Sequence, residues 1–169
     1  FLHYRPDTAI LTSVELDHVD VFDSLESVRE AFRTFVALLP EGGLLVVCGE
    51  VPEAVAVAQG APCRVERYAV APDGADAGEP TPTGVTWWAT GLETAKAGRV
   101  AFDVYRGNER LDRFETLLIG RHNVGNCLAA IAVCHARGVS LDALRRGVGS
   151  FAGVRRRQEL RGVAGGVHV

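Results

Sequence analysis

The stretch Leu44-Leu-Val-Val-Cys48 is an unbroken run of apolar residues, and it decides the fold class. Such a run, without polar alternation, predicts a strand that is covered on both faces, as in a parallel sheet. An amphipathic helix is expected before it over 25–39, with Asp23 and Glu26 spaced as a capping box. Thr8-Ala-Ile-Leu-Thr-Ser-Val14 predicts another buried strand. Strand, helix and strand in this order indicate a βαβ unit with two parallel strands.

The rest of the chain continues this alternation and then changes character. An exposed loop rich in Pro, Gly, Asp and Ala separates two patterns, of which the second favours antiparallel strands joined by a two-residue turn. The expected elements, in chain order, are a helix over 51–59, a strand over 64–70, the loop over 71–84, strands over 85–89, 100–105 and 110–118 with the turn at 107–108, and helices over 123–137 and 140–149. The fold class is therefore α/β, a mostly parallel sheet with flanking helices plus an antiparallel hairpin region.

Composition narrows the class of protein. The chain has 169 residues, of which 47% are hydrophobic, and this suits one domain with a buried core. A net charge of −3 gives no reason to expect nucleic acid or an anionic membrane as a partner. Cys48, Cys63, Cys127 and Cys134 form no Cys-x-x-Cys pair, so we expect core thiols and a cytoplasmic location. The chain starts at Phe1 and contains no Met, and we expect it to be an internal piece of a larger protein.

The first candidate site is Glu15-Leu-Asp-His-Val-Asp20. It directly follows a predicted parallel strand, and loops beyond the carboxyl ends of such strands build the binding crevice of open α/β sheets. Four side chains able to bind a metal or transfer a proton lie within these six residues. The alternative is a polar loop in which Asp20 or Asp23 caps the next helix.

The second candidate is Gly120-Arg-His-Asn-Val-Gly-Asn126, where a helix opens. A helix N-terminus offers free N–H groups and partial positive charge, which favour anions and polar rings. His122, Asn123 and Asn126 are spaced to gather at this end, and an Asn amide can pair with both N6 and N7 of adenine. In the alternative, Asn123 is simply the N-cap of the helix.

The third candidate is Phe151-Ala-Gly-Val-Arg-Arg-Arg-Gln158. Guanidinium groups match phosphate oxygens, so three consecutive Arg residues after a Gly could clamp phosphates. The alternative is a solvated basic linker.

These three segments, in this order and with these intervening lengths, resemble the Mur ligase family of ATP-dependent ligases in bacterial cell-wall precursor assembly. The resemblance rests on Thr12-Ser-Val-Glu-Leu-Asp-His-Val-Asp20, on Gly120-Arg-His-Asn-Val-Gly-Asn-Cys-Leu-Ala-Ala130 and on Phe151-Ala-Gly-Val-Arg-Arg-Arg-Gln-Glu159. It covers nearly the whole chain. One departure is Ser13, since the family often has Asn just before the Glu-x-Asp-His stretch.

The resemblance implies an enzyme of three domains whose P-loop-type central domain binds ATP. Residues 1–152 would be the C-terminal part of that domain, and 153–169 a linker and the start of the C-terminal domain. The Walker A lysine and the amine-binding residues would lie outside this chain, so we expect no ligase activity from the chain alone.

The resemblance also implies roles for single residues. His18 would ligate a Mg²⁺ ion that bridges the acceptor carboxylate and the γ-phosphate. His122, Asn123 and Asn126 would hold adenine, and Arg157, with Arg156 beside it, would contact phosphate. The reaction would form an acyl phosphate on a carboxylate and then an amide.

The substrates follow from the branch of the family. Val19-Asp-Val-Phe-Asp-Ser-Leu-Glu-Ser-Val28 and the Phe-x-Gly-Val-x-Arg-Arg string favour the branch that joins the tripeptide L-Ala-γ-D-Glu-meso-diaminopimelate to UDP-N-acetylmuramate in peptidoglycan recycling. The alternative is the branch that adds L-alanine in de novo synthesis. Two readings of another class are a metal-dependent hydrolase using Asp17, His18 and Asp20, and a non-catalytic nucleotide-binding module.

Overall fold

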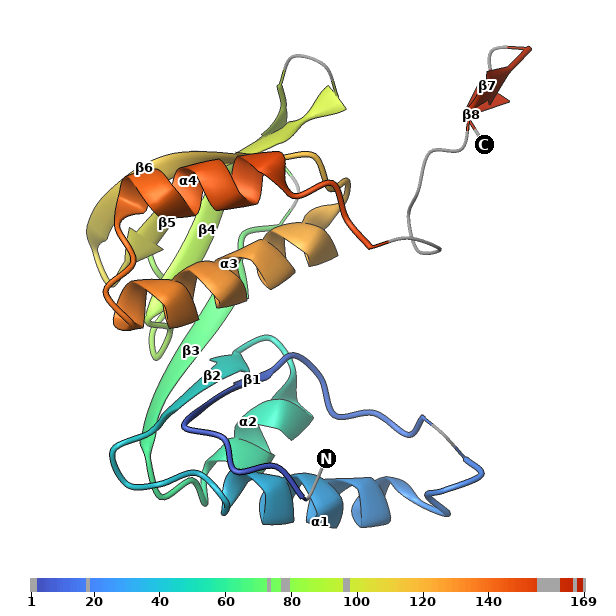
Figure 1. Ribbon diagram of the computed structural model, residues 1–169, viewed down its shortest axis with the longest axis vertical. Helices are drawn as coiled ribbons and strands as arrows, with labels where there is room; N and C mark the ends of the chain where they lie inside the picture. Colours follow the sequence, from blue (N-terminus) through green and yellow to red (C-terminus); the bar gives the residue numbers. More distant parts are fainter. Residues whose placement is uncertain are drawn as a thin grey trace.

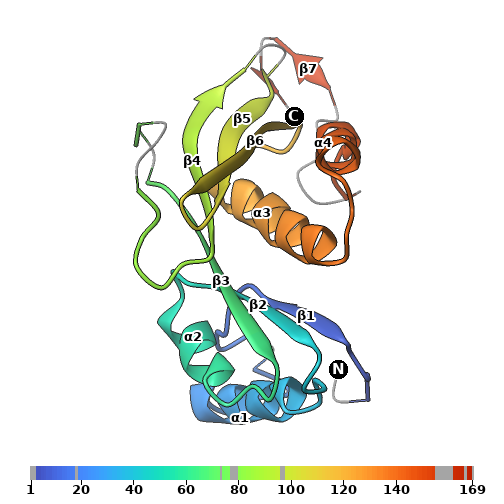
Figure 2. The same ribbon diagram turned by 90° about the vertical axis from the view of Figure 1, so that its left-hand side faces the viewer.

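The computed structural model describes residues 3–17, 19–72, 74–76, 80–95, 98–154, 162–165 and 167–168. Its main feature is a six-stranded sheet in the order β1-β2-β3-β4-β5-β6, so neighbours in the sheet are also neighbours in the sequence. Figures 1 and 2 show this single twisted sheet with helices packed on it. The elements are β1 (Thr8–Leu11), α1 (Leu25–Val36), β2 (Leu44–Cys48), α2 (Pro52–Ala58), β3 (Arg64–Val70), β4 (Trp87–Thr94), β5 (Val100–Arg106), β6 (Glu109–Thr116), α3 (Arg121–Ala136), α4 (Leu141–Ser150), β7 (Val163–Ala164) and β8 (Val167–His168).

The sheet is parallel in its first half and antiparallel in its second. β1, β2, β3 and β4 pair in parallel, and β4, β5 and β6 pair antiparallel. The predicted α/β class, with parallel strands and a hairpin region, is confirmed. The change of direction comes one strand later than the sequence pattern indicated, because β4 still pairs in parallel with β3 through Tyr68 and Trp87. β4 also begins at Trp87 and extends to Thr94, beyond the predicted strand over 85–89.

Strand β2 lies at the centre of the parallel half and is buried on both faces, as predicted. Leu44, Val46 and Cys48 belong to the apolar cluster that α3 covers. Leu45 and Val47 point to the other face, where they belong to a second apolar cluster with α1 and α2. The helices therefore cover opposite faces of the parallel strands, which is the layered arrangement expected of an α/β domain.

Strand β1 differs from its prediction. It is shorter than the expected 8–14 stretch, and only one of its faces is buried. Ala9 and Leu11 are 8% and 2% exposed, whereas Ile10, on the other face, is 40% exposed. β1 forms an edge of the sheet, and α3 is packed mainly over β2, β3 and β4.

Helix α1 begins with a capping box, but one residue later than predicted. Ser24 is the N-cap: its Oγ accepts from the Ser27 N–H at 3.2 Å, and the Ser27 Oγ accepts from the Ser24 N–H at 3.3 Å. Asp23 is therefore not the cap. Glu26 instead pairs with Arg29 at 2.9 Å and with Arg33 at 2.7 Å on the helix surface. Serine and aspartate are both good N-caps, and the backbone conformation decided between them.

Beside the antiparallel strands, one buried carboxylate organises the start of β4. Glu66 is 5% exposed, and its Oε2 accepts a hydrogen bond of 2.6 Å from the Trp87 indole Nε1. Its Oε1 lies 3.4 Å from guanidinium nitrogens of both Arg64 and Arg106. The Arg106 guanidinium also lies 5.5 Å from the centre of the Trp87 ring. A buried charge requires such partners, so this cluster fixes where β3, β4 and β5 meet.

The C-terminal part of the described chain is a small separate sheet. β7 and β8 pair antiparallel, Val163 with His168 and Ala164 with Val167. The division into 1–152 and 153–169 stays a prediction. Among the described residues, no helix has the length and apolarity that crossing a lipid bilayer requires.

The cap of α1 gives a stability prediction. Replacing Ser24 with Ala removes the side-chain acceptor for the Ser27 N–H, and we expect the free energy of unfolding to fall by about 1 kcal/mol. Asp23→Ala is the matched control and should change it by less than about 0.5 kcal/mol. Urea denaturation followed by circular dichroism measures both; a larger loss for the Asp23 variant would contradict the assignment of the cap.

Candidate functional site

The carboxyl ends of the parallel strands form one edge of the sheet, and the segments that follow three of these strands lie along it. The loop over 12–22 follows β1, Glu50 follows β2, and Ala71 follows β3. Helix α3 also begins at this edge. The side chain of Arg121, its first residue, donates a hydrogen bond to the Ala71 carbonyl there. In Figure 1 the loop after β1 and the start of α3 both lie toward the right-hand side. This is the position at which open α/β sheets bind their ligands.

Helix α3 starts from a glycine in an unusual conformation. Gly120 is the N-cap, with a φ of 94°, and it provides no side-chain cap. A Cβ at this position would lie 3.0 Å from the His122 ring, so both the backbone angle and the space favour glycine. Because the helix begins at Arg121, Asn123 lies within its first turn. The alternative in which Asn123 is the N-cap is therefore wrong.

The predicted adenine-binding side chains do come together at this helix start. The Asn126 Nδ2 donates to the Asn123 Oδ1 at 3.4 Å, and the Asn123 Nδ2 donates to the Ile119 carbonyl at 2.8 Å. His122 and Asn126 are exposed and Asn123 is partly exposed. Amide and imidazole groups that are at least partly exposed to solvent are thus grouped at one helix end.

The electrostatics of this helix start favour an anionic or polar ligand. The first turn of α3 carries no acidic residue, although acidic residues are the usual partners of the partial positive charge at a helix N-terminus. It carries Arg121 and His122 instead. Arg121 is paired with Glu50, but the side chains of His122, Asn123 and Asn126 offer hydrogen-bonding groups that suit a nucleotide, which has a base rich in such groups.

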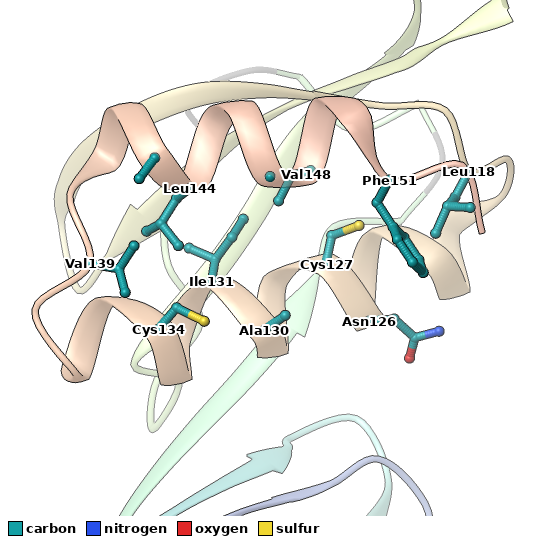
Figure 3. A pocket seen from close by; sticks show the side chains of 12 residues that line it. Leu118, Asn126, Cys127, Ala130, Ile131, Cys134, Val139, Leu144, Val148 and Phe151 are labelled. Carbon is teal, nitrogen blue, oxygen red and sulfur yellow. The ribbon is translucent and has the colours of Figure 1, made fainter. Parts of the chain in front are cut away.

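An apolar groove of about 400 Å³ lies between α3 and α4. It is lined almost entirely by apolar side chains, namely Leu118, Cys127, Ala130, Ile131, Cys134, Val139, Ala143, Leu144, Val148 and Phe151, together with Gly147 and Asn126. In Figure 3 the Asn126 amide points away from α4 and out of the groove. The groove and the amides of the helix start therefore do not converge on one ligand.

The metal candidate is placed only in part. Val14 is 2% exposed and anchors the loop after β1, while Glu15, Asp17 and Asp20 are exposed on it. His18 lies outside the described residues, as do Arg156 and Arg157. Within the described ranges, no three His, Cys, Asp or Glu side chains are close enough together to hold a metal ion. Mg²⁺ commonly uses one or two carboxylates and completes its shell with water and phosphate, so the oxygen donors of this loop suit it.

Two residues that organise this edge have no role that the sequence alone indicates. Arg121 forms an ion pair with Glu50, which lies just past the end of β2. The two residues are 71 positions apart, and each alone is an ordinary charged residue beside a turn or a helix end. Only the parallel order of β2 and β3 beneath α3 brings them together, so no local signal could have found the pair.

Comparison with known proteins decides the family. The model of the Mur ligase middle domain matches residues 2–134. The chain belongs to the Mur ligase family. The UDP-N-acetylmuramate–L-alanine ligases of Acetivibrio thermocellus and of Mycolicibacterium vanbaalenii are 30% and 38% identical to it, over 100% and 99% of this chain and 34% of each relative.

A solved Mur ligase shows the same fold. The UDP-N-acetylmuramate:L-alanyl-gamma-D-glutamyl-meso-diaminopimelate ligase of Neisseria meningitides is 31% identical, with a TM-score of 0.72, over 92% of this chain and 43% of that structure. The chain spans about a third of the length of the curated relatives that it matches. The expected resemblance and the expected α/β middle-domain fold are both confirmed.

The cysteines of α3 provide a test of this side of the molecule. Burial raises the pKa of the Cys127 thiol, which is 8% exposed and donates to the Thr116 hydroxyl at 3.8 Å. Because the thiolate is the reactive form, we expect iodoacetamide at pH 7.5 to label Cys127 at least about tenfold more slowly than Cys134. Cys134 lies two turns further along the same helix and is partly exposed. Mass spectrometry of the peptides measures both rates, and equal labelling of the native protein would contradict the packing of α3.

Proposed function

We propose that the full-length protein containing this chain is an ATP-dependent amide ligase that acts on UDP-N-acetylmuramate. The match to the Mur ligase middle domain carries this proposal. The curated relatives are named as ligases that join UDP-N-acetylmuramate to L-alanine, and the Neisseria protein is named as one that joins it to a peptide. The carboxyl edge of the sheet would be one side of the active site.

The adenine side of the site is proposed at the start of α3. Asn126 and Asn123 present amides that can donate to N7 and accept from the N6 amino group of adenine. His122 is exposed beside them and could contact the same ring. The hydrogen bond that joins the two amides would hold both in one orientation before the base arrives. Arg157, with Arg156, is proposed to contact the phosphates.

The phosphoryl-transfer side is proposed at the loop after β1. His18 is the proposed protein ligand of a Mg²⁺ ion there, with the exposed carboxylates of Asp17 and Asp20 nearby in the sequence. A bound Mg²⁺ supplies charge neutralisation to phosphate and carboxylate oxygens during phosphoryl transfer. The buried Val14 holds the start of this loop against the core, so the polar residues after it stay at the carboxyl edge.

The acceptor amine is proposed to be L-alanine. Both curated relatives described above are named UDP-N-acetylmuramate–L-alanine ligases, although motifs in the sequence favoured the tripeptide. The tripeptide remains the second candidate, because the Neisseria ligase is 31% identical to this chain over 92% of its length. A cytoplasmic location is part of the proposal, since Cys48, Cys63, Cys127 and Cys134 are all free thiols, as is usual in a reducing compartment.

Two substitutions in the full-length protein should separate the adenine side from the phosphoryl-transfer side. We expect His18→Ala to lower turnover by on the order of a hundredfold or more while ATP affinity is kept. We expect Asn126→Ala to weaken ATP binding by about 5- to 100-fold, because it removes the pairing to the base. Calorimetric titration with ATP and a phosphate-release assay measure the two effects. ATP binding without phosphate release by the wild type would favour a non-catalytic nucleotide-binding module, and unchanged turnover in the His18 variant would contradict the proposed role of His18.

A substrate assay decides between the acceptors. The full-length protein is offered UDP-N-acetylmuramate and ATP with either L-alanine or the free tripeptide, and ADP release is measured. We expect turnover with L-alanine at least about tenfold above that with the tripeptide, since acceptor sites commonly discriminate by this much or more. The reverse ratio would favour the peptide ligase, and turnover with neither would contradict the ligase proposal itself.

A further inference from the structure

Arg121 makes an unusual set of contacts for the first residue of a helix. Its Nε donates to the Ala71 carbonyl at 2.9 Å, and its Nη2 donates to the Val70 carbonyl and to the Glu50 carboxylate. All three partners are 50 or more positions away in the sequence. The side chain is only about a third exposed, so these contacts are partly shielded from water.

Glu50 is the second half of this arrangement. Its Oε2 accepts from the Val70 N–H at 3.0 Å, while its Oε1 pairs with Arg121. The carboxylate therefore joins the chain after β2 to the end of β3 and to the first residue of α3. The end of β3 is itself fixed, because the Ala71 N–H donates to the Ala89 carbonyl in β4 at 2.7 Å.

The charge of Arg121 opposes the helix on which it lies. A cation at a helix N-terminus faces the partial positive end of the helix dipole, which is unfavourable. Here Glu50 and two carbonyl oxygens offset that cost, and the planar guanidinium meets them in fixed directions. A lysine or a neutral residue would not reproduce this geometry, so the contacts define the position of the helix start and not merely its charge.

We propose that Arg121, held by Glu50, is the positioning residue that sets the Asn123 and Asn126 amides for adenine. This inference rests on the proposed nucleotide site. Gly120 gives the helix no side-chain cap, so its start depends on contacts from further away. Asn126 lies about one and a half turns beyond Arg121, and a rigid helix transmits any shift of its start to that amide. The Arg121 contacts thus join the start of α3 to the ends of β2 and β3. These strand ends lie at the same edge of the sheet as the loop after β1.

The test compares ATP with inosine triphosphate in the full-length protein. The two nucleotides share the same triphosphate, and inosine triphosphate has an oxygen in place of the N6 amino group. The ratio of their dissociation constants therefore isolates recognition of the base. The ratio of the wild type is the reference value. We expect Asn126→Ala to abolish the preference for ATP that this ratio shows.

For Arg121→Ala we expect the preference for ATP to fall by about tenfold, with the affinity for inosine triphosphate unchanged within about twofold. Glu50→Gln, which keeps the shape but removes the charge, should give a smaller loss in the same direction. Arg137→Ala is the matched control: Arg137 follows the other end of α3 and contacts the Thr8 hydroxyl, and its loss should leave the ratio unchanged.

The outcomes are distinct. A residue that only stabilised the fold would, on removal, lower the melting temperature or weaken both nucleotides equally, and either result without a change in the ratio overturns the inference. A loss of the preference in the Arg137 variant as large as that in the Arg121 variant also overturns it. If the wild type does not prefer ATP, the proposed adenine site itself is wrong, and this is seen before any Arg121 variant is measured.

Discussion

Burial of β2 on both faces is the constraint on which the rest of this structure depends. Leu45, Val46 and Val47 are fully buried, so the strand must have neighbours on both sides and helices above and below. A strand of this kind is stable in a parallel sheet with two helical layers. Parallel strands then bring all their carboxyl ends to one edge. The loop after β1, Glu50 and the start of α3 meet at that edge for this reason, although they are far apart in the sequence.

The fold could be predicted well where the signal is local. The apolar run of β2, the turn at Gly107 and the cap at Ser140 follow from the types of residue at each position, and the structure confirms them. Two predictions that were wrong, the cap of α1 and the extent of β4, failed for a similar physical reason. Ser24 rather than Asp23 caps α1, and β4 continues to Thr94, because backbone conformation and strand pairing decided between residues of similar propensity.

The candidate site divides in the same way. His122, Asn123 and Asn126 could be grouped from their spacing along one helix, and the structure places their side chains at one end of α3. The Arg121–Glu50 pair could not, because it depends on how a helix docks over strands that come much earlier in the chain. The exposure of Ile10 could not be predicted for a related reason. The apolar run of β1 indicates burial, but it does not show whether α3 extends far enough to cover this edge strand.

The sequential order of the six strands has a consequence for how the molecule assembles. Each strand pairs with the one made just before it, so the sheet can grow along the chain by closing only short or single-helix connections. The entropy of closing each such connection grows only slowly with its length. The long-range step is the docking of α3, whose Arg121–Glu50 contact closes a loop of 71 positions. Because this contact joins distant parts of the chain, the start of α3 can take its final position only when the ends of β2 and β3 are in place.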